Sequence, residues 1–166
     1  MIDLNTYQLI CLDIDGTIAK RSEDVLYDDV LARLADYTGH LALTTNQGGP
    51  ACRDAGWKNS KSYPTMAEVS TRCQAFADIL EARLYIAFAY VTGRGKVLIP
   101  KGLDPDSGPA QRNWRKPGPG MIRQASKDCG VAGEAVLMVG DRPEDQAAAQ
   151  NAGVAFMWAD VFFERT

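Results

Sequence analysis

The segment that most constrains this chain is residues 9–17, LICLDIDGT, in which four apolar residues lead into two carboxylates and a glycine. A short apolar run bounded by such a turn signal predicts a buried strand that presents Asp13 and Asp15 at its carboxyl end. Open α/β sheets bind ligands at that end of their strands. Two carboxylates two residues apart on a pleated strand point the same way, and their repulsion favours a bound cation or a shared proton. A hydrated Asx-Gly turn without a ligand is the alternative interpretation.

Apolar strand patterns and amphipathic helix patterns alternate along the chain. This order predicts an α/β fold: a Rossmann-like, doubly wound parallel sheet with helices on both faces. The expected strands are residues 9–12, 41–44, 85–91, 135–139 and 154–158, with a short one at 97–99. The expected helices run from 25 to near Gly39 and over 65–83, 119–129 and 143–151, and residues 51–64 are expected to be irregular. Thr65 followed by Glu68 is typical of a capping box. A chain of 166 residues, 46% of them hydrophobic, is predicted to form a single domain over residues 1–166.

Composition argues against several classes of protein. The formal net charge is −3, so no general attraction to polyanions or anionic membranes is expected. The longest apolar run, residues 84–91, is too short to cross a bilayer, and the N-terminus lacks a basic start before an apolar segment. We therefore expect no membrane association and a cytoplasmic location. The four cysteines are scattered without a CxxC pattern, which favours free thiols over disulfides or a zinc site.

Three further polar groups follow predicted strands or precede a predicted helix. Thr45 follows the second strand, where its hydroxyl and the neighbouring amides could hold an anion. Lys116 lies before a helix whose N-terminus is partly positive, and Asp141 repeats after the fourth strand the pattern of Asp13. Taken singly, a turn threonine, a solvated lysine and, at Asp145, a first-turn carboxylate are sufficient explanations. Together these groups are predicted to meet at one edge of the sheet.

This combination of residues resembles the haloacid dehalogenase (HAD) superfamily of phosphohydrolases. The matching motifs are DIDGT at residues 13–17, the apolar strand ending in Thr45 and Asn46, RKPGPGM at residues 115–121, and VGDRPEDQAAAQNAG at residues 139–153. TNQ together with RKPGPGM is similar to subfamily IIIA, which holds histidinol phosphatases, heptose bisphosphate phosphatases and polynucleotide 3′-phosphatase domains. The resemblance spans nearly the whole chain.

The resemblance implies a role for each motif residue. Asp13 would be the nucleophile that forms an aspartyl-phosphate, and Asp15 the acid that protonates the leaving oxygen and then activates water. Mg²⁺ would be held by Asp13, the main-chain carbonyl of Asp15 and Asp141. Thr45 and Lys116 would neutralise the charge of the phosphoryl oxygens. The remaining expected site residues are Gly16, Thr17, Asn46 and Arg115 for substrate binding, and Asp145, which would orient Lys116 or a water on the metal.

The chain also departs from the family pattern. Heptose bisphosphate phosphatases and their histidinol relatives often carry a structural zinc loop of cysteines and a histidine; this sequence has no such loop, so zinc is not expected. His40, the single histidine, is expected in a turn or on the surface. The first gap between motifs is too short for a full cap domain, and the second is mostly accounted for by a predicted helix, a predicted strand and a basic loop. We therefore expect an open site that admits a large substrate or is covered by a neighbouring subunit, and the sequence leaves the oligomeric state open.

The segment from Thr92 to Lys116 bears on the substrate, because it carries six basic and two acidic residues. This local positive charge favours a substrate with negative charge beyond the scissile phosphate over cationic histidinol phosphate. A small phosphorylated metabolite, such as a sugar phosphate or bisphosphate, is expected; a nucleic-acid end bearing a 3′-phosphate is the alternative. A third hypothesis, from a different class, is a non-catalytic Mg²⁺-binding module like a receiver domain. It requires an aspartate at the end of the third strand, where this chain has Val91-Thr92-Gly93.

Overall fold

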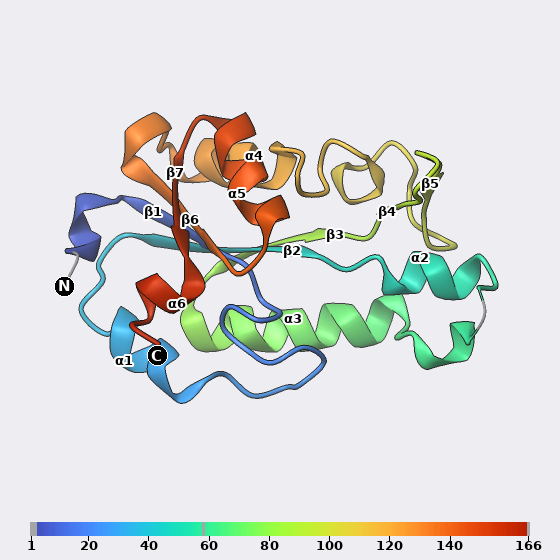
Figure 1. Ribbon diagram of the computed structural model, residues 1–166, viewed down its shortest axis with the longest axis horizontal. Coiled ribbons are helices and arrows are strands. Elements are labelled where there is room, and N and C mark those ends of the chain that lie inside the picture. Colours follow the sequence, from blue (N-terminus) through green and yellow to red (C-terminus); the bar gives the residue numbers. More distant parts are fainter. Residues whose placement is uncertain (1–2, 58, 166) are drawn as a thin grey trace.

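The centre of the structure, a computed structural model that describes residues 3–57 and 59–165, is a sheet of five parallel strands (Figure 1). The strands lie in the order β3-β2-β1-β6-β7, with bounds β1 Leu9–Leu12, β2 His40–Asn46, β3 Arg83–Ala87, β6 Val136–Gly140 and β7 Ala155–Trp158. β1 pairs with β2 on one side and with β6 on the other, so the strand that precedes Asp13 is central. The predicted α/β class and parallel sheet are confirmed.

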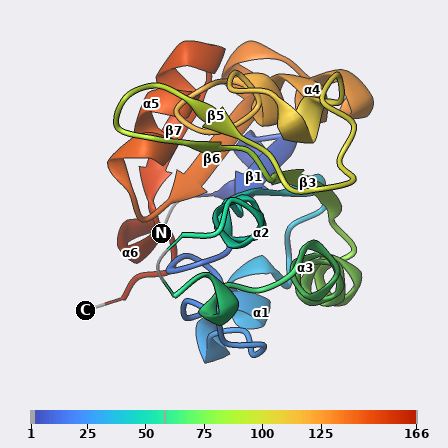
Figure 2. The same cartoon turned by 90° about the vertical axis from the view of Figure 1, so that its right-hand side faces the viewer.

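Helices cover both faces of this sheet, as Figures 1 and 2 show. One face carries α1 Asp28–Leu34, α3 Met66–Leu80 and α6 Ala159–Phe162, and the other carries α4 Gly120–Cys129 and α5 Pro143–Ala152. α2 Gly49–Asp54 directly follows β2, and the short antiparallel strands β4 Tyr90–Val91 and β5 Val97–Leu98 form a hairpin. Single 3-10 turns occur at Leu4–Thr6, Ser60–Ser62, Gly108–Ala110 and Gly133–Ala135.

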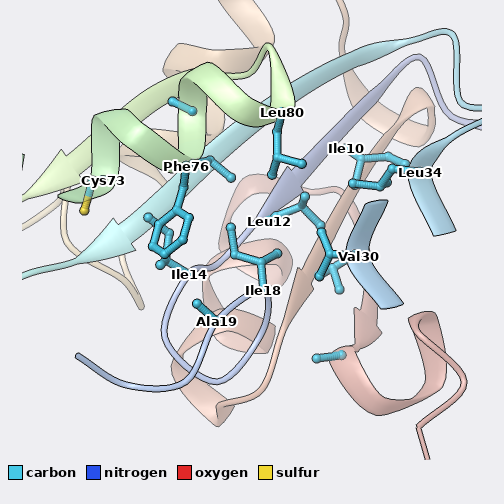
Figure 3. Close-up of a cluster of buried hydrophobic side chains, with 14 of the residues drawn as sticks. Ile10, Leu12, Ile14, Ile18, Ala19, Val30, Leu34, Cys73, Phe76 and Leu80 are labelled. Atoms are coloured by element: carbon cyan, nitrogen blue, oxygen red, sulfur yellow. The ribbon is translucent and has the colours of Figure 1, made fainter. Parts of the chain in front are cut away.

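Strand β1 is buried on both faces, because its side chains alternate between two cores. Ile10 and Leu12 pack toward α1 and α3, where Phe76 lies among them (Figure 3). Leu9 and Cys11 face α4 and α5. All four β1 residues are fully buried, so the loop that carries Asp13 and Asp15 begins at a rigidly held strand.

The capping box predicted at the start of α3 is present. The Glu68 amide donates to the Thr65 hydroxyl at 3.2 Å, and the Glu68 carboxylate accepts from the Thr65 amide at 2.7 Å. The helix ends at Leu80 rather than near Arg83, because Glu81 adopts a left-handed conformation with φ of 51°.

Three further local predictions were wrong. The strand expected over residues 85–91 ends at Ala87, because the amides of Phe88 and Ala89 donate to the Pro109 carbonyl instead of continuing the sheet. Residues 51–64, expected to be irregular, include most of α2, which has a proline in its first turn. The helix expected from Val25 to near Gly39 runs only from Asp28 to Leu34, and the Val25 side chain is exposed.

Several expectations about the chain as a whole agree with the described residues. The segments between the sheet strands form loops, helices and a hairpin, and no large cap insertion is evident among the described residues. All four cysteines are free. His40 begins β2 and is exposed. In the part of the chain that the structure describes, no helix is long and apolar enough to cross a membrane.

Candidate active site

The predicted site residues converge at the carboxyl edge of the sheet. Asp13 follows β1 directly, Thr45 lies near the end of β2, and Asp141 follows β6. The Asp13 amide continues the sheet ladder by donating to the Val139 carbonyl at 3.0 Å. Lys116 reaches the same edge from the loop before α4. The fold therefore brings together groups that lie up to 128 positions apart in the chain, from Asp13 to Asp141.

Lys116 is the centre of this cluster. Its ammonium donates to Asp13 Oδ1 at 2.6 Å, Asp145 Oδ1 at 2.5 Å and the Thr44 carbonyl at 2.8 Å. These bonds use all three of its protons. The Lys116 side chain is only 2% exposed. Burial alone would lower its pKa, but the two carboxylates outweigh that effect and raise it, so the amine is charged.

The carboxylates around Lys116 carry more negative charge than one ammonium can balance. One oxygen from each of Asp13, Asp141 and Asp145 lies within 4.8 Å of the others. Burial raises the pKa of Asp13 to about 7, against the opposing pull of Lys116, and the two other carboxylates add to the rise. The pKa of Asp141 is also raised, by burial and then by Asp145. A divalent cation would relieve this repulsion, so the cluster could hold a metal.

The two acids of the first motif diverge, contrary to the geometry expected from a continuous strand. Asp13 faces Lys116, whereas Asp15 Oδ1 accepts from Arg72 Nη2 at 2.9 Å and its Oδ2 accepts from Gln47 Nε2 at 2.7 Å. The reason is that the strand pleat ends at Leu12. The Asp15 side chain lies outside the carboxylate cluster, so its expected metal contact through the main-chain carbonyl stays a prediction.

Gly16 and Thr17 have different surroundings, although both were expected to bind substrate. Gly16 has a φ of 95°, and a Cβ there would collide with the Asp141 carboxylate, so glycine permits the loops after β1 and β6 to touch. Thr17 is fully buried: its amide donates to the Ile14 carbonyl at 3.2 Å, and its hydroxyl has no hydrogen-bond partner among the described residues. The structure thus places Thr17 in the interior of the loop.

Asn46 and Arg115, also expected to bind substrate, support the loop that carries Lys116. The Asn46 amide donates to the Lys116 carbonyl at 2.9 Å and accepts from the Lys116 amide at 3.0 Å. This pair of bonds fixes the backbone from which the lysine side chain extends. The Arg115 guanidinium donates to the Ala89 carbonyl at 3.1 Å and lies over the Tyr90 ring.

Two site residues were missed by sequence reasoning. Gln47 Nε2 bridges Asp15 Oδ2 and the Thr45 hydroxyl, the latter at 2.9 Å. Its place beside Asn46 in the TNQ motif was the available signal. Arg72 gave no signal, because it lies within α3, far from any strand end, and contacts Asp15 across 57 positions of sequence.

Two open hollows flank the cluster. One of about 850 Å³ lies on the α2 and α3 side and includes Asp15 and Arg72 in its wall. The other, of about 480 Å³, is lined by Asn46, Lys116, Arg115 and Arg112, among others. Both have the volume of a small-molecule site. The basic segment of residues 92–116 thus contributes Arg112 and Arg115 to the second hollow, whereas Arg94 is not among the residues that line it.

Comparison with known proteins agrees with this geometry. The family model described as HAD-hydrolase-like matches residues 113–159, which include Lys116, Asp141 and Asp145. The chain is 28% identical over 158 residues to a D-glycero-beta-D-manno-heptose-1,7-bisphosphate 7-phosphatase of Mesorhizobium japonicum, covering 89% of this chain and 66% of that protein. It therefore spans just under two thirds of that relative's length.

Solved structures share the fold. A D,D-heptose 1,7-bisphosphate phosphatase from B. bronchiseptica, solved with magnesium and phosphate, matches with a TM-score of 0.62 and 23% identity over 90% of this chain and 78% of its own. A protein from Mesorhizobium loti, described as a HAD-like phosphatase, matches with a TM-score of 0.58 and 20% identity over 90% of this chain and 70% of its own.

In sheet order, site residues and these matches the chain is similar to HAD-like phosphatases. Heptose-1,7-bisphosphate phosphatases are among the proteins it resembles both in sequence and in structure.

Proposed function

We propose that this protein is a Mg²⁺-dependent phosphate-monoester hydrolase that works through an aspartyl-phosphate on Asp13. The observation that carries the proposal is the buried contact of Asp13 with Lys116, with Asp141 and Asp145 beside it, at the edge where α/β sheets bind ligands. We further infer that residues 1–166 form one phosphatase domain, because a single sheet edge gathers all of these groups.

The proposed reaction has two displacements at phosphorus. In the first, a carboxylate oxygen of Asp13 attacks phosphorus, the bond from phosphorus to the leaving oxygen breaks, and Asp15 gives its proton to that oxygen. In the second, water attacks phosphorus, Asp15 takes a proton from it, and the bond between Asp13 and phosphorus breaks to release inorganic phosphate. After the second displacement, Asp13 and Asp15 are both back in their starting states.

The surrounding groups fit this chemistry. Asp13, Asp141 and the Asp15 main-chain carbonyl would hold Mg²⁺, which when bound offsets the charge of the carboxylates and of the phosphate. The Lys116 ammonium lies beside the attacking carboxylate, where it neutralises charge on the phosphoryl oxygens, while Asp145 keeps it in place. The Thr45 hydroxyl accepts from Gln47, which leaves its own proton to donate to phosphate.

Removal of the metal should abolish catalysis. Phosphate release from an aryl phosphate is expected to stop in EDTA and to return when Mg²⁺ is added in excess of the chelator. A spectrophotometric assay of the released phenol measures this. Full activity in EDTA would refute metal dependence, and failure to hydrolyse any ester with Mg²⁺ present would favour the non-catalytic module.

For the substrate, we propose a small phosphorylated metabolite with a second anionic group, such as a sugar bisphosphate. The named relatives and the basic side chains in the 480 Å³ hollow support this choice. A 3′-phosphate nucleic-acid end is the second candidate, because the described residues include no large cap insertion over the site. An acidic chain offers little general attraction to a polyanionic strand, which favours the metabolite.

The basic segment provides a test of this substrate class. Arg112→Ala should raise KM for a sugar bisphosphate about tenfold with little change in kcat, since a charge-assisted hydrogen bond contributes about 1.5–3 kcal/mol and acts in ground and transition states alike. Arg94→Ala is the matched control: it removes the same charge from the same segment but does not alter the lining of the hollow. Equal KM changes in both variants, or a similar change with a small aryl phosphate, would indicate that the positive charge of this segment serves solubility and not substrate recognition.

A further inference from the structure

Asp15 is attached to two other parts of the chain through both of its carboxylate oxygens. Arg72 of α3 donates to Oδ1 at 2.9 Å, joined by the Ser22 amide at 3.3 Å, and Gln47 after β2 donates to Oδ2 at 2.7 Å. The Asp15 side chain is 19% exposed and that of Arg72 is 14% exposed. Donors on both oxygens restrict rotation of the carboxylate, so its direction is set by the fold.

The Arg72 guanidinium has further contacts that fix it independently of Asp15. Its Nε donates to the Glu23 carbonyl at 2.8 Å, and its Nη2 lies 3.3 Å from the Lys20 carbonyl. The guanidinium carbon lies 5.2 Å from the centre of the Phe76 ring, which is buried in the core. A planar group with several directed donors and an aromatic support presents its remaining N–H in a defined direction.

Gln47 links Asp15 to Thr45, the residue proposed to donate a hydrogen bond to the phosphate. Its side-chain nitrogen also donates to the Thr45 hydroxyl at 2.9 Å, so one amide group bridges Asp15 and Thr45. Asp15 and Arg72 both border the 850 Å³ hollow, so the carboxylate can be approached from solvent. The acid is therefore fixed and reachable, as proton transfer to a bound ester requires.

We infer that Arg72 is a positioning residue for Asp15: together with Gln47 it holds the carboxylate at the place from which it protonates the leaving oxygen. This inference rests on the proposed function and deepens it, because it assigns a role in proton transfer to a helix residue outside all four motifs. The competing explanation is a purely structural one, in which Arg72 only ties the loop after β1 to α3.

Leaving-group dependence separates the two explanations. Arg72→Met keeps the apolar stem over Phe76 and removes the donors, so kcat/KM for an alkyl phosphate should fall about 100-fold, the scale of a misplaced catalytic group. For an activated aryl phosphate, whose leaving oxygen needs no proton, it should fall less than about threefold. The ratio kcat/KM is the suitable quantity, because it excludes the later hydrolysis of the aspartyl-phosphate.

Two further variants complete the design. Arg72→Lys retains charge and should restore part of the alkyl-phosphate rate; it also serves if Arg72→Met does not fold, which thermal melting will show. Asp24→Asn is the matched control, because it removes only the exposed partner 3.4 Å from Arg72 Nε and should leave both substrates unaffected. In an Asp15→Asn background, Arg72→Met should cause no additional loss.

The outcomes distinguish this inference from the proposed function. Selective loss on alkyl phosphates that disappears in the Asp15→Asn background supports the positioning role. Equal loss on both substrates, persistence of the loss in that background, or faster turnover of alkyl phosphates would overturn it while the phosphatase proposal stands. If Asp15→Asn itself showed no leaving-group dependence, the acid assigned to Asp15 would be wrong, and the inference would fall with it.

Discussion

Asp13→Asn should lower kcat by at least about 10⁴-fold, the scale observed when a catalytic nucleophile is removed. Asparagine retains an oxygen that can accept from Lys116 but cannot attack phosphorus. The fold should survive, because burial raises the pKa of Asp13 to about 7 and a neutral amide avoids that desolvation cost. Phosphate release and thermal melting measure the two expectations.

Asp160→Asn is the matched control for this variant, since Asp160 is an exposed aspartate of α6. It makes the same chemical change away from the site and should leave kcat unchanged. An Asp13→Asn protein that melts as the wild type does but hydrolyses an aryl phosphate at the wild-type rate would remove Asp13 from the mechanism.

Lys116→Met should both inactivate and destabilise the protein. The substitution leaves two buried carboxylates, Asp13 and Asp145, without their cation, and breaking a buried ion pair from one side costs about 3–5 kcal/mol. Chemical denaturation measures the free energy of unfolding of the variant. Activity should fall as well, because the phosphoryl charge loses its neutralising ammonium.

A double variant separates charge from packing in this result. Lys116→Met combined with Asp145→Asn removes one of the two uncompensated carboxylates, so it should recover part of the lost stability but none of the activity. Wild-type stability in the single variant would show that Lys116 does not balance the buried acids. If the double variant recovers no stability, the stability lost in Lys116→Met comes from packing and not from the uncompensated charge.

The sequence was sufficient to predict the part of the site that lies at strand ends. Asp13 and Asp141 follow apolar strands of a parallel sheet, and parallel strands deliver such residues to one edge whatever the intervening chain does. Lys116 was found from its motif. Its contacts with Asp13 and Asp145 depend on the register between loops, which no local pattern encodes.

The remaining features could not be predicted, because they depend on contacts between distant segments. The strand pleat ends at Leu12, and beyond it the Asp15 oxygens accept from Arg72, 57 positions later, and from Gln47. The strand expected to continue past Ala87 stops because Phe88 and Ala89 find an acceptor at Pro109. In both cases the local pattern was compatible with two outcomes, and tertiary hydrogen bonds selected one.

The most direct test of the proposed mechanism is to locate the covalent phosphoryl group. The protein, mixed with Mg²⁺ and a phosphate ester and quenched in acid during turnover, should yield a phosphorylated peptide whose modification maps to Asp13 by mass spectrometry. The same experiment with Asp13→Asn should yield none. A phosphoryl group on another residue, or sustained phosphate release by the Asp13→Asn variant, would contradict the proposal that Asp13 is the nucleophile.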